Sequence, residues 1–199
     1  MLPPACVLKI PKAFFILMDW LEFRDNVEKC TNCPLSKSRK NAVFGDGPSN
    51  ARIVIVGEAP GRDEDENGRP FVGMSGRELT KMLDEVGIKR EDVFITNTVK
   101  CRPPDNRKPS ANEIEACRHH LERQISEIKP ALICTLGNVP LNSIIGKHSI
   151  GDVNGNVMKK DGSAFLPLYH PAAWLYNRKL REKAKKGYEK IKTISIEKQ

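Results

Sequence analysis

Residues 52–57 read RIVIVG, an apolar and largely β-branched run that stops at a glycine. Continuous apolarity without alternation is typical of a strand in a parallel sheet, because such a strand is covered on both faces. Further apolar runs at residues 93–99, 131–136 and 164–168 predict three more strands. The sequence therefore predicts a four-stranded parallel sheet at the centre of the molecule.

Helical patterns separate these strands, at residues 75–85, 110–129 and 140–145. The second pattern begins with a capping box formed by Ser110 and Glu113, which is a strong signal for a helix start. Alternating strands and helices require crossover connections that place the helices on both faces of a parallel sheet. The predicted fold class is therefore α/β, as a three-layer α/β/α sandwich.

The length of 199 residues suits one compact domain. We expect this domain to span residues 18–177, because Met18 resembles a natural start. Residues 1–17 would then be an N-terminal extension, and residues 178–199 a basic C-terminal helix or tail. The apolar run 13–18 is too short to span a bilayer, and no small-residue cleavage site follows it. We expect a cytoplasmic monomer with no membrane partner.

The net charge of +8 leaves two interpretations open. One is a solvated surface of lysine and arginine with a basic tail. The other is a polyanionic partner such as nucleic acid, since basic side chains that neutralise phosphates release condensed counterions. Charge alone does not separate the two.

The cysteines form the most specific pattern in the chain. A short helix expected at residues 19–29 leads into Cys30 and Cys33, a C-x-x-C pair, and Cys101 and Cys117 follow far downstream. In a chain without a secretory signal, this set indicates a metal or iron–sulfur centre rather than disulfides. Zinc and iron–sulfur clusters both accept four thiolates, so the spacing leaves both open. We interpret the remaining cysteines as buried free thiols, at Cys6 and Cys134.

Polar and aromatic residues gather where the predicted strands end. Glu58 follows the first strand, Asn97 lies at the end of the second, and His170 follows the fourth. Since the carboxyl ends of parallel strands meet at one edge, these residues form one candidate site, with Phe71 close to it. Each residue alone has an ordinary structural explanation, but their convergence predicts a binding site.

This set of side chains suits recognition of a nucleobase. An amide offers one donor and one acceptor, which match the adjacent O4 and N3–H of a pyrimidine. An aromatic ring can stack on the base, and an imidazole can donate to a carbonyl oxygen that gains negative charge. A base inside a duplex reaches such a site only when its nucleotide rotates out of the helix.

Four motifs resemble those of the family 4 uracil-DNA glycosylases, the iron–sulfur enzymes of thermophilic bacteria and archaea. They are GEAPG (57–61), GRPFVG (68–73), TNTVKCRPP (96–104) and HPAA (170–173). The resemblance covers about residues 20–177 and keeps the order of the motifs. The last motif reads HPAA where many relatives carry HPS, which retains the histidine.

The resemblance implies a uracil-DNA glycosylase-like fold and a 4Fe–4S cluster held by Cys30, Cys33, Cys101 and Cys117. It implies a uracil site in which Phe71 stacks on the base and Asn97 reads its edge. The full set of expected uracil-binding residues is Gly57, Glu58, Ala59, Phe71, Asn97 and His170. The expected catalytic residues are Glu58, Asn97 and His170.

The implied reaction is hydrolysis of the N-glycosidic bond of uracil in single- or double-stranded DNA, the first step of base excision repair. His170 would donate to uracil O2, and Glu58 would activate water, with Glu64 as the alternative. Glu64 lies in the acidic run 63–66, which we interpret as a solvated loop. The cluster would brace a DNA-contacting loop that carries Arg102, Arg107 and Lys108.

Three other functions remain open from the sequence. One is a related glycosylase with broader specificity for deaminated bases. Another is a non-catalytic, metal-stabilised module that binds nucleic acid, which would release no base. The third is an α/β enzyme acting on free nucleotides, whose binding would depend little on salt because it would contact few phosphates.

Overall fold

The computed structural model describes residues 12–196, with side chains from residue 18 to residue 193. Of the expected N-terminal extension, residues 1–17, the first eleven residues lie outside the described part of the chain. Cys6 is among them. The first helix, α1 (Lys12–Glu28), begins well before the expected residue 19, because the preceding apolar run contains no helix-breaking residue. Among residues 12–196, no helix combines the length and the apolar composition that a membrane crossing requires.

The sheet has five strands in the order β2-β1-β3-β5-β4. The four expected strands are present and pair in parallel: β1 (Ile53–Gly57), β2 (Val93–Asn97), β3 (Leu132–Leu136) and β5 (Ser163–Leu168). The expected count of four was too low, because β4 (Met158–Lys160) adds an antiparallel strand beside β5. β4 has only three residues, two of them exposed lysines, so it lacks the apolar run by which the others were recognised.

Helices connect the strands as the predicted order requires. The helices after α1 are α2 (Arg62–Asn67), α3 (Met74–Glu85), α4 (Ala111–Ile128), α5 (Asn138–Ile144), α6 (Ile150–Val153) and α7 (Arg178–Ile196). The capping box at the start of α4 is present, with Ser110 accepting from the Glu113 amide and Glu113 accepting from the Ser110 amide. α7 is the basic C-terminal helix that the sequence indicated.

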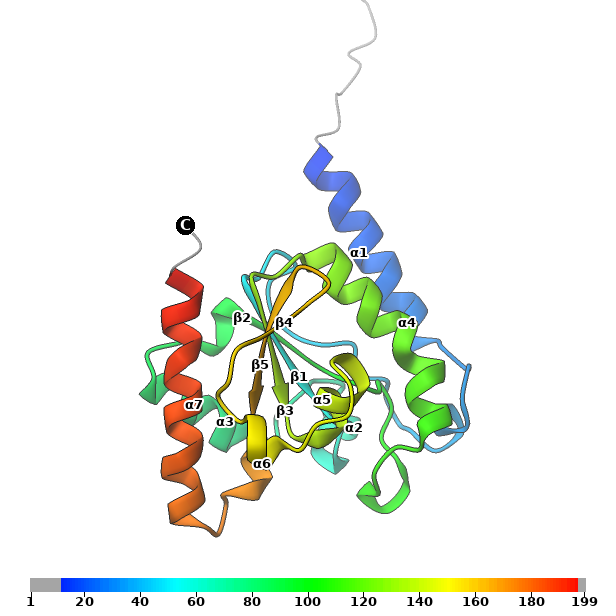
Figure 1. Ribbon diagram of the computed structural model, residues 1–199. Coiled ribbons are helices and arrows are strands. Elements are labelled where there is room, and N and C mark those ends of the chain that lie inside the picture. Colours follow the sequence, from blue (N-terminus) through cyan, green and yellow to red (C-terminus); the bar gives the residue numbers. More distant parts are fainter. Residues whose placement is uncertain (1–11, 197–199) are drawn as a thin grey trace, which may run out of the picture.

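The helices cover both faces of the sheet, as expected for a three-layer α/β/α sandwich. Figure 1 shows α1 and α4 on one side and α3 and α7 on the other. Alternate residues of β1 separate into two buried clusters: Ile53 and Ile55 pack with α3 and α7, whereas Val54 and Val56 pack with α1 and α4. Burial on both sides explains why the strand is apolar at every position.

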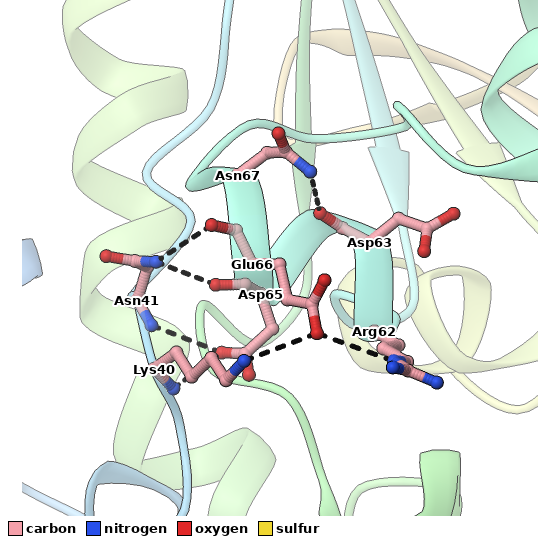
Figure 2. Close-up of polar contacts among 7 residues, drawn as sticks. All are labelled: Lys40, Asn41, Arg62, Asp63, Asp65, Glu66 and Asn67. Carbon is pink, nitrogen blue, oxygen red and sulfur yellow. Dashed lines mark hydrogen bonds and ion pairs between the residues drawn. The ribbon is translucent and has the colours of Figure 1, made fainter.

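The acidic run 63–66 is helical, so the expectation of a loop was wrong, and only part of the run is solvated: Asp63 and Glu66 are exposed, whereas Asp65 is buried. Asp65 is 3% exposed, and its carboxylate accepts hydrogen bonds from the backbone N–H groups of Lys40 and Asn41. Figure 2 shows these contacts together with the bonds from Lys40 and Arg62 to Glu66. Helix α2 therefore holds the segment that follows the C-x-x-C pair against the strand-end loops.

Asp65→Ala should destabilise the protein by about 1–3 kcal/mol, because it leaves two backbone N–H groups without their buried acceptor. Asp63→Ala is the matched control, since Asp63 is exposed on the same helix, and it should change stability by less than about 0.5 kcal/mol. Urea unfolding followed by circular dichroism measures both. Equal losses in the two variants would show that Asp65 acts only through its helix.

Candidate active site and thiolate centre

A small cavity of about 140 Å³ opens at the carboxyl ends of the parallel strands. The structure brings four of the predicted residues to this cavity, Ala59, Phe71, Asn97 and His170. Gly61, Glu64 and Ser75 complete its wall. These residues come from distant parts of the sequence and meet because parallel strands end at one edge.

Asn97 ends β2 and is 1% exposed, yet its side-chain Oδ1 has no hydrogen-bond partner among the described residues. A buried amide oxygen without a partner is costly, and native structures rarely keep one without a functional reason. Since Asn97 lines the cavity, this oxygen is an acceptor available to a ligand.

Gly57 gives Asn97 and Phe71 the space that they occupy. It ends β1 directly opposite Asn97 in the parallel register. A Cβ atom at Gly57 would lie 2.4 Å from Asn97 Oδ1 and 2.7 Å from the Phe71 ring. Any larger residue at position 57 would therefore displace both groups.

Phe71 occupies the left-handed backbone region at φ 52°, which is unusual for an aromatic residue. The next two backbone N–H groups, of Val72 and Gly73, donate to Glu64 Oε1 at 2.9 and 2.8 Å. Glu64 Oε2 accepts a third backbone N–H, from Gly61, at 3.1 Å. Glu64 thus fixes the turn that presents the Phe71 ring.

His170 follows β5 and caps the short 3-10 helix η4 (Pro171–Ala173). Its Nδ1 accepts the Ala172 N–H at 3.2 Å, so the proton of the neutral imidazole is on Nε2. Burial lowers the pKa of His170 to about 4, which keeps the ring neutral at pH 7. Its centroid lies 5.7 Å from that of Phe71, so a donor N–H and an aromatic face share the cavity.

Glu58 is half-buried and directly follows β1, but its side chain is not among the groups that line the cavity. Burial raises the pKa of the Glu58 carboxyl, and the nearby Lys108 ammonium partly opposes that shift. The Glu58 carboxylate is therefore within electrostatic reach of Lys108.

The four predicted ligand cysteines line one second cavity, although they come from separate segments. Cys30 and Cys33 lie between α1 and the 3-10 helix η1 (Pro34–Lys37), Cys101 lies after β2, and Cys117 lies in α4. Cys134 is buried in the middle of β3, as the sequence indicated, away from this cavity.

Five polar residues that the sequence did not single out also line the cysteine cavity: Asn32, Ser36, Arg39, Lys100 and His120. Arg39 Nη1 donates to Cys101 Sγ at 2.9 Å, and the Lys100 backbone N–H donates to Cys117 Sγ at 3.3 Å. The burial of Lys100 had no signal in the sequence, because a lone lysine is most often solvated.

Burial controls the electrostatics of these groups. Burial raises the pKa of the Cys117 thiol to about 11. It also raises the pKa of Cys101 above its ordinary value, although the Arg39 guanidinium partly opposes that increase. It lowers the pKa of Lys100 to about 8, against the attraction of Cys117 and Cys101. His120 is 6% exposed, and neither ring nitrogen has a hydrogen-bond partner in the described part of the chain. The wall of the cysteine cavity thus carries the cationic side chains of Arg39 and Lys100 and a buried histidine, which suits an anionic group.

All four predicted ligand cysteines line the same cavity. Within the described residues, no three histidine, cysteine or carboxylate side chains are placed to hold a single metal ion. The ligands of a polynuclear cluster each bind a different iron atom and stand further apart than four ligands of one zinc ion. Four cysteines around one cavity supply the set of thiolates that an iron–sulfur cluster takes.

A larger cavity of about 290 Å³ lies between α4, α5 and the β4–β5 hairpin. It contains none of the predicted site residues. Its floor is apolar, with Ile125 and Ile133 among its lining residues, and the charged Arg118 and Lys160 also line it.

Comparison with known proteins gives a consistent result. Residues 44–192 match the family model described as "Uracil DNA glycosylase superfamily". A type-4 uracil-DNA glycosylase of Saccharolobus solfataricus is 47% identical over 178 residues, which cover 84% of this chain and 82% of the relative. One from Thermotoga maritima is 47% identical over 175 residues, covering 85% and 91%. The chain belongs to the type-4 branch of the uracil-DNA glycosylase superfamily.

Proposed function

We propose that the protein hydrolyses the N-glycosidic bond of deoxyuridine in DNA, releasing uracil and leaving an abasic site. The observation that carries this proposal is the unpartnered Asn97 Oδ1, buried in a cavity that also holds the Phe71 ring and the His170 imidazole. A planar heterocycle with an N–H group and flanking carbonyl oxygens complements all three groups.

Asn97 would select uracil by its hydrogen-bonding edge. Its Oδ1 would accept from uracil N3–H, and its amide N–H would donate to O4. Cytosine presents an unprotonated N3 and an N4 amino group at these positions, so it would leave buried polar groups mismatched. A site of this kind can discriminate strongly, because an unpaired buried group is costly.

His170 would stabilise the departing base. Cleavage of the glycosidic bond places negative charge on uracil, including its O2 atom, and positive charge on the sugar. The Nε2–H of His170, whose tautomer follows from the Ala172 contact, would donate to O2. A preorganised donor in a site that excludes water is an effective way to stabilise developing charge.

Glu58 is the better candidate for the group that activates water. Both carboxylate oxygens of Glu64, the alternative, already accept backbone N–H groups, and proton abstraction would disturb the turn that presents Phe71. The raised pKa of Glu58 moves its basicity towards neutral pH, as suits a general base.

We infer that Cys30, Cys33, Cys101 and Cys117 hold a 4Fe–4S cluster. The cavity that the four cysteines share and the similarity of the chain to type-4 uracil-DNA glycosylases support this assignment. Bound there, the cluster would supply a rigid anionic anchor, with no electron transfer in the hydrolysis. The cysteines would thereby join the N-terminal helix to the loop after β2.

That loop would contact DNA, with Lys108 exposed near Glu58. Arg107 is less available for DNA, because its guanidinium already donates to both carboxylate oxygens of Glu113 at 2.8 and 2.7 Å. We therefore assign phosphate contact to Arg102 and Lys108 and a loop-bracing role to Arg107. The substrate would be single- or double-stranded DNA, bound by a cytoplasmic monomer.

Asn97→Ala and His170→Ala should each reduce uracil release about 10²–10³-fold, because each removes a hydrogen bond that the cavity cannot replace. The assay is alkaline cleavage of a uracil-containing oligonucleotide after incubation with enzyme. His148→Ala, which alters an exposed histidine, should leave the rate unchanged. Full activity in both cavity variants would refute the proposed site.

Uracil release should fall as pH decreases through the raised pKa of Glu58, since only the ionised carboxylate accepts a proton. Glu58→Gln should lower the rate about 10²–10⁴-fold and remove this acid limb from the profile of kcat/KM against pH. An unchanged acid limb in Glu58→Gln would assign the titration to another group.

Cys117→Ala should lose iron and the brown-yellow visible absorption, and its melting temperature should fall because a bound centre stabilises only the folded state. Cys134→Ala is the matched control, as a buried cysteine outside the cavity, and it should retain both iron and colour. Iron and sulfide analysis of the purified proteins decides the outcome. Stoichiometric zinc in place of iron would contradict the cluster assignment.

A further inference from the structure

A buried lysine lies between the base cavity and the cysteine cavity. Lys100 is 1% exposed and lines the cavity that holds the four cysteines. Its Nζ donates to Thr96 Oγ1 at 2.7 Å, to the Asn97 carbonyl oxygen at 2.8 Å and to Gln124 Oε1 at 2.6 Å. These three acceptors use all three N–H groups of an ammonium, so the geometry is that of the charged form.

All three acceptors are neutral. Among the described residues, no carboxylate forms an ion pair with Lys100, although its side chain is fully enclosed. A buried cation without a counter-charge is strongly unfavourable, and native proteins usually pair it. The charge of Lys100 therefore requires an anionic group close by.

The cysteine centre is the anionic group within reach. The Lys100 backbone N–H donates to Cys117 Sγ, and Cys101 is the next residue in the chain. Four deprotonated thiolates on a 4Fe–4S core carry a net negative charge, whereas four neutral thiols carry none. Only the loaded centre therefore compensates the ammonium.

We propose that Lys100 is the internal counter-ion of the cysteine-bound cluster and, through the same ammonium, a positioning residue for Asn97. This inference rests on the cluster assigned under the proposed function. The ammonium holds the Asn97 carbonyl and the Thr96 hydroxyl at the end of β2, which sets the backbone that aims the Asn97 amide into the base cavity. The cluster charge keeps that ammonium buried.

The test is the reduction potential of the cluster in the intact, cluster-loaded enzyme, measured by a redox titration followed by electron paramagnetic resonance. Lys100→Met keeps the length of the side chain and removes its charge. Its potential should become more negative, because a nearby cation stabilises the reduced and more negative cluster. Lys37→Met is the matched control, since Lys37 is exposed in η1 beside Cys33, and its potential should match the wild type.

Lys100→Arg keeps the positive charge, so its comparison with Lys100→Met separates the loss of charge from a steric loss of the cluster. If Lys100→Met loses iron while Lys100→Arg retains it, the requirement for positive charge is upheld. If both lose iron, the site needs the shape of lysine rather than its charge, and the counter-ion role is wrong. In Lys100→Met that retains the cluster, the kcat for uracil release should also fall, with little change for Lys37→Met.

The two levels of the proposal fail in different ways. Wild-type protein without iron would overturn the cluster and, with it, the counter-ion. Wild-type protein with iron, but with equal potentials in Lys100→Met and Lys37→Met, would overturn the counter-ion alone. A lowered potential with unchanged kcat would overturn only the positioning of Asn97.

Discussion

The parallel register of β1 and β2 is the constraint on which both sites depend. It sets Gly57 opposite Asn97, and the missing side chain of the glycine leaves the space that the amide and the Phe71 ring share. Lys100 and Cys101 follow the same strand end, within four residues of Asn97. A single strand terminus thus borders the cavity lined by Asn97 and Phe71 on one side and the cysteine cavity on the other.

Carboxylates that accept backbone N–H groups, rather than apolar contacts alone, shape the loops around this terminus. Glu64 collects three backbone N–H groups and holds Phe71 in an unusual conformation. Asp65, one residue later, collects two more from the segment after the C-x-x-C pair. Neighbouring carboxylates in one short helix therefore fix two separate loops, the turn that carries Phe71 and the segment after the C-x-x-C pair.

Local sequence patterns predicted most of the strands and helices. The features that the sequence did not predict depend on contacts between residues far apart in the chain. The runs that became β1 and β3 were visible because both faces of those strands are buried. β4 was missed because a three-residue strand with two lysines carries no such pattern. Lys100 and Arg39 were missed because their roles depend on acceptors far away in the sequence, such as Gln124 and Cys101. Asn97 could be singled out, but its unpartnered oxygen is visible only once the cavity exists.

The short strand β4 also determines how the sheet ends. It pairs with β5 and so covers the edge of that strand. The outermost strand of the sheet on this side therefore carries the exposed residues Lys159 and Lys160. On the opposite side, Asp46 exchanges two backbone hydrogen bonds with Ile95 of β2. Charged, short or capped margins discourage strand addition by another chain. Both outer strands of the sheet are thereby protected from edge-to-edge pairing with other copies of the chain.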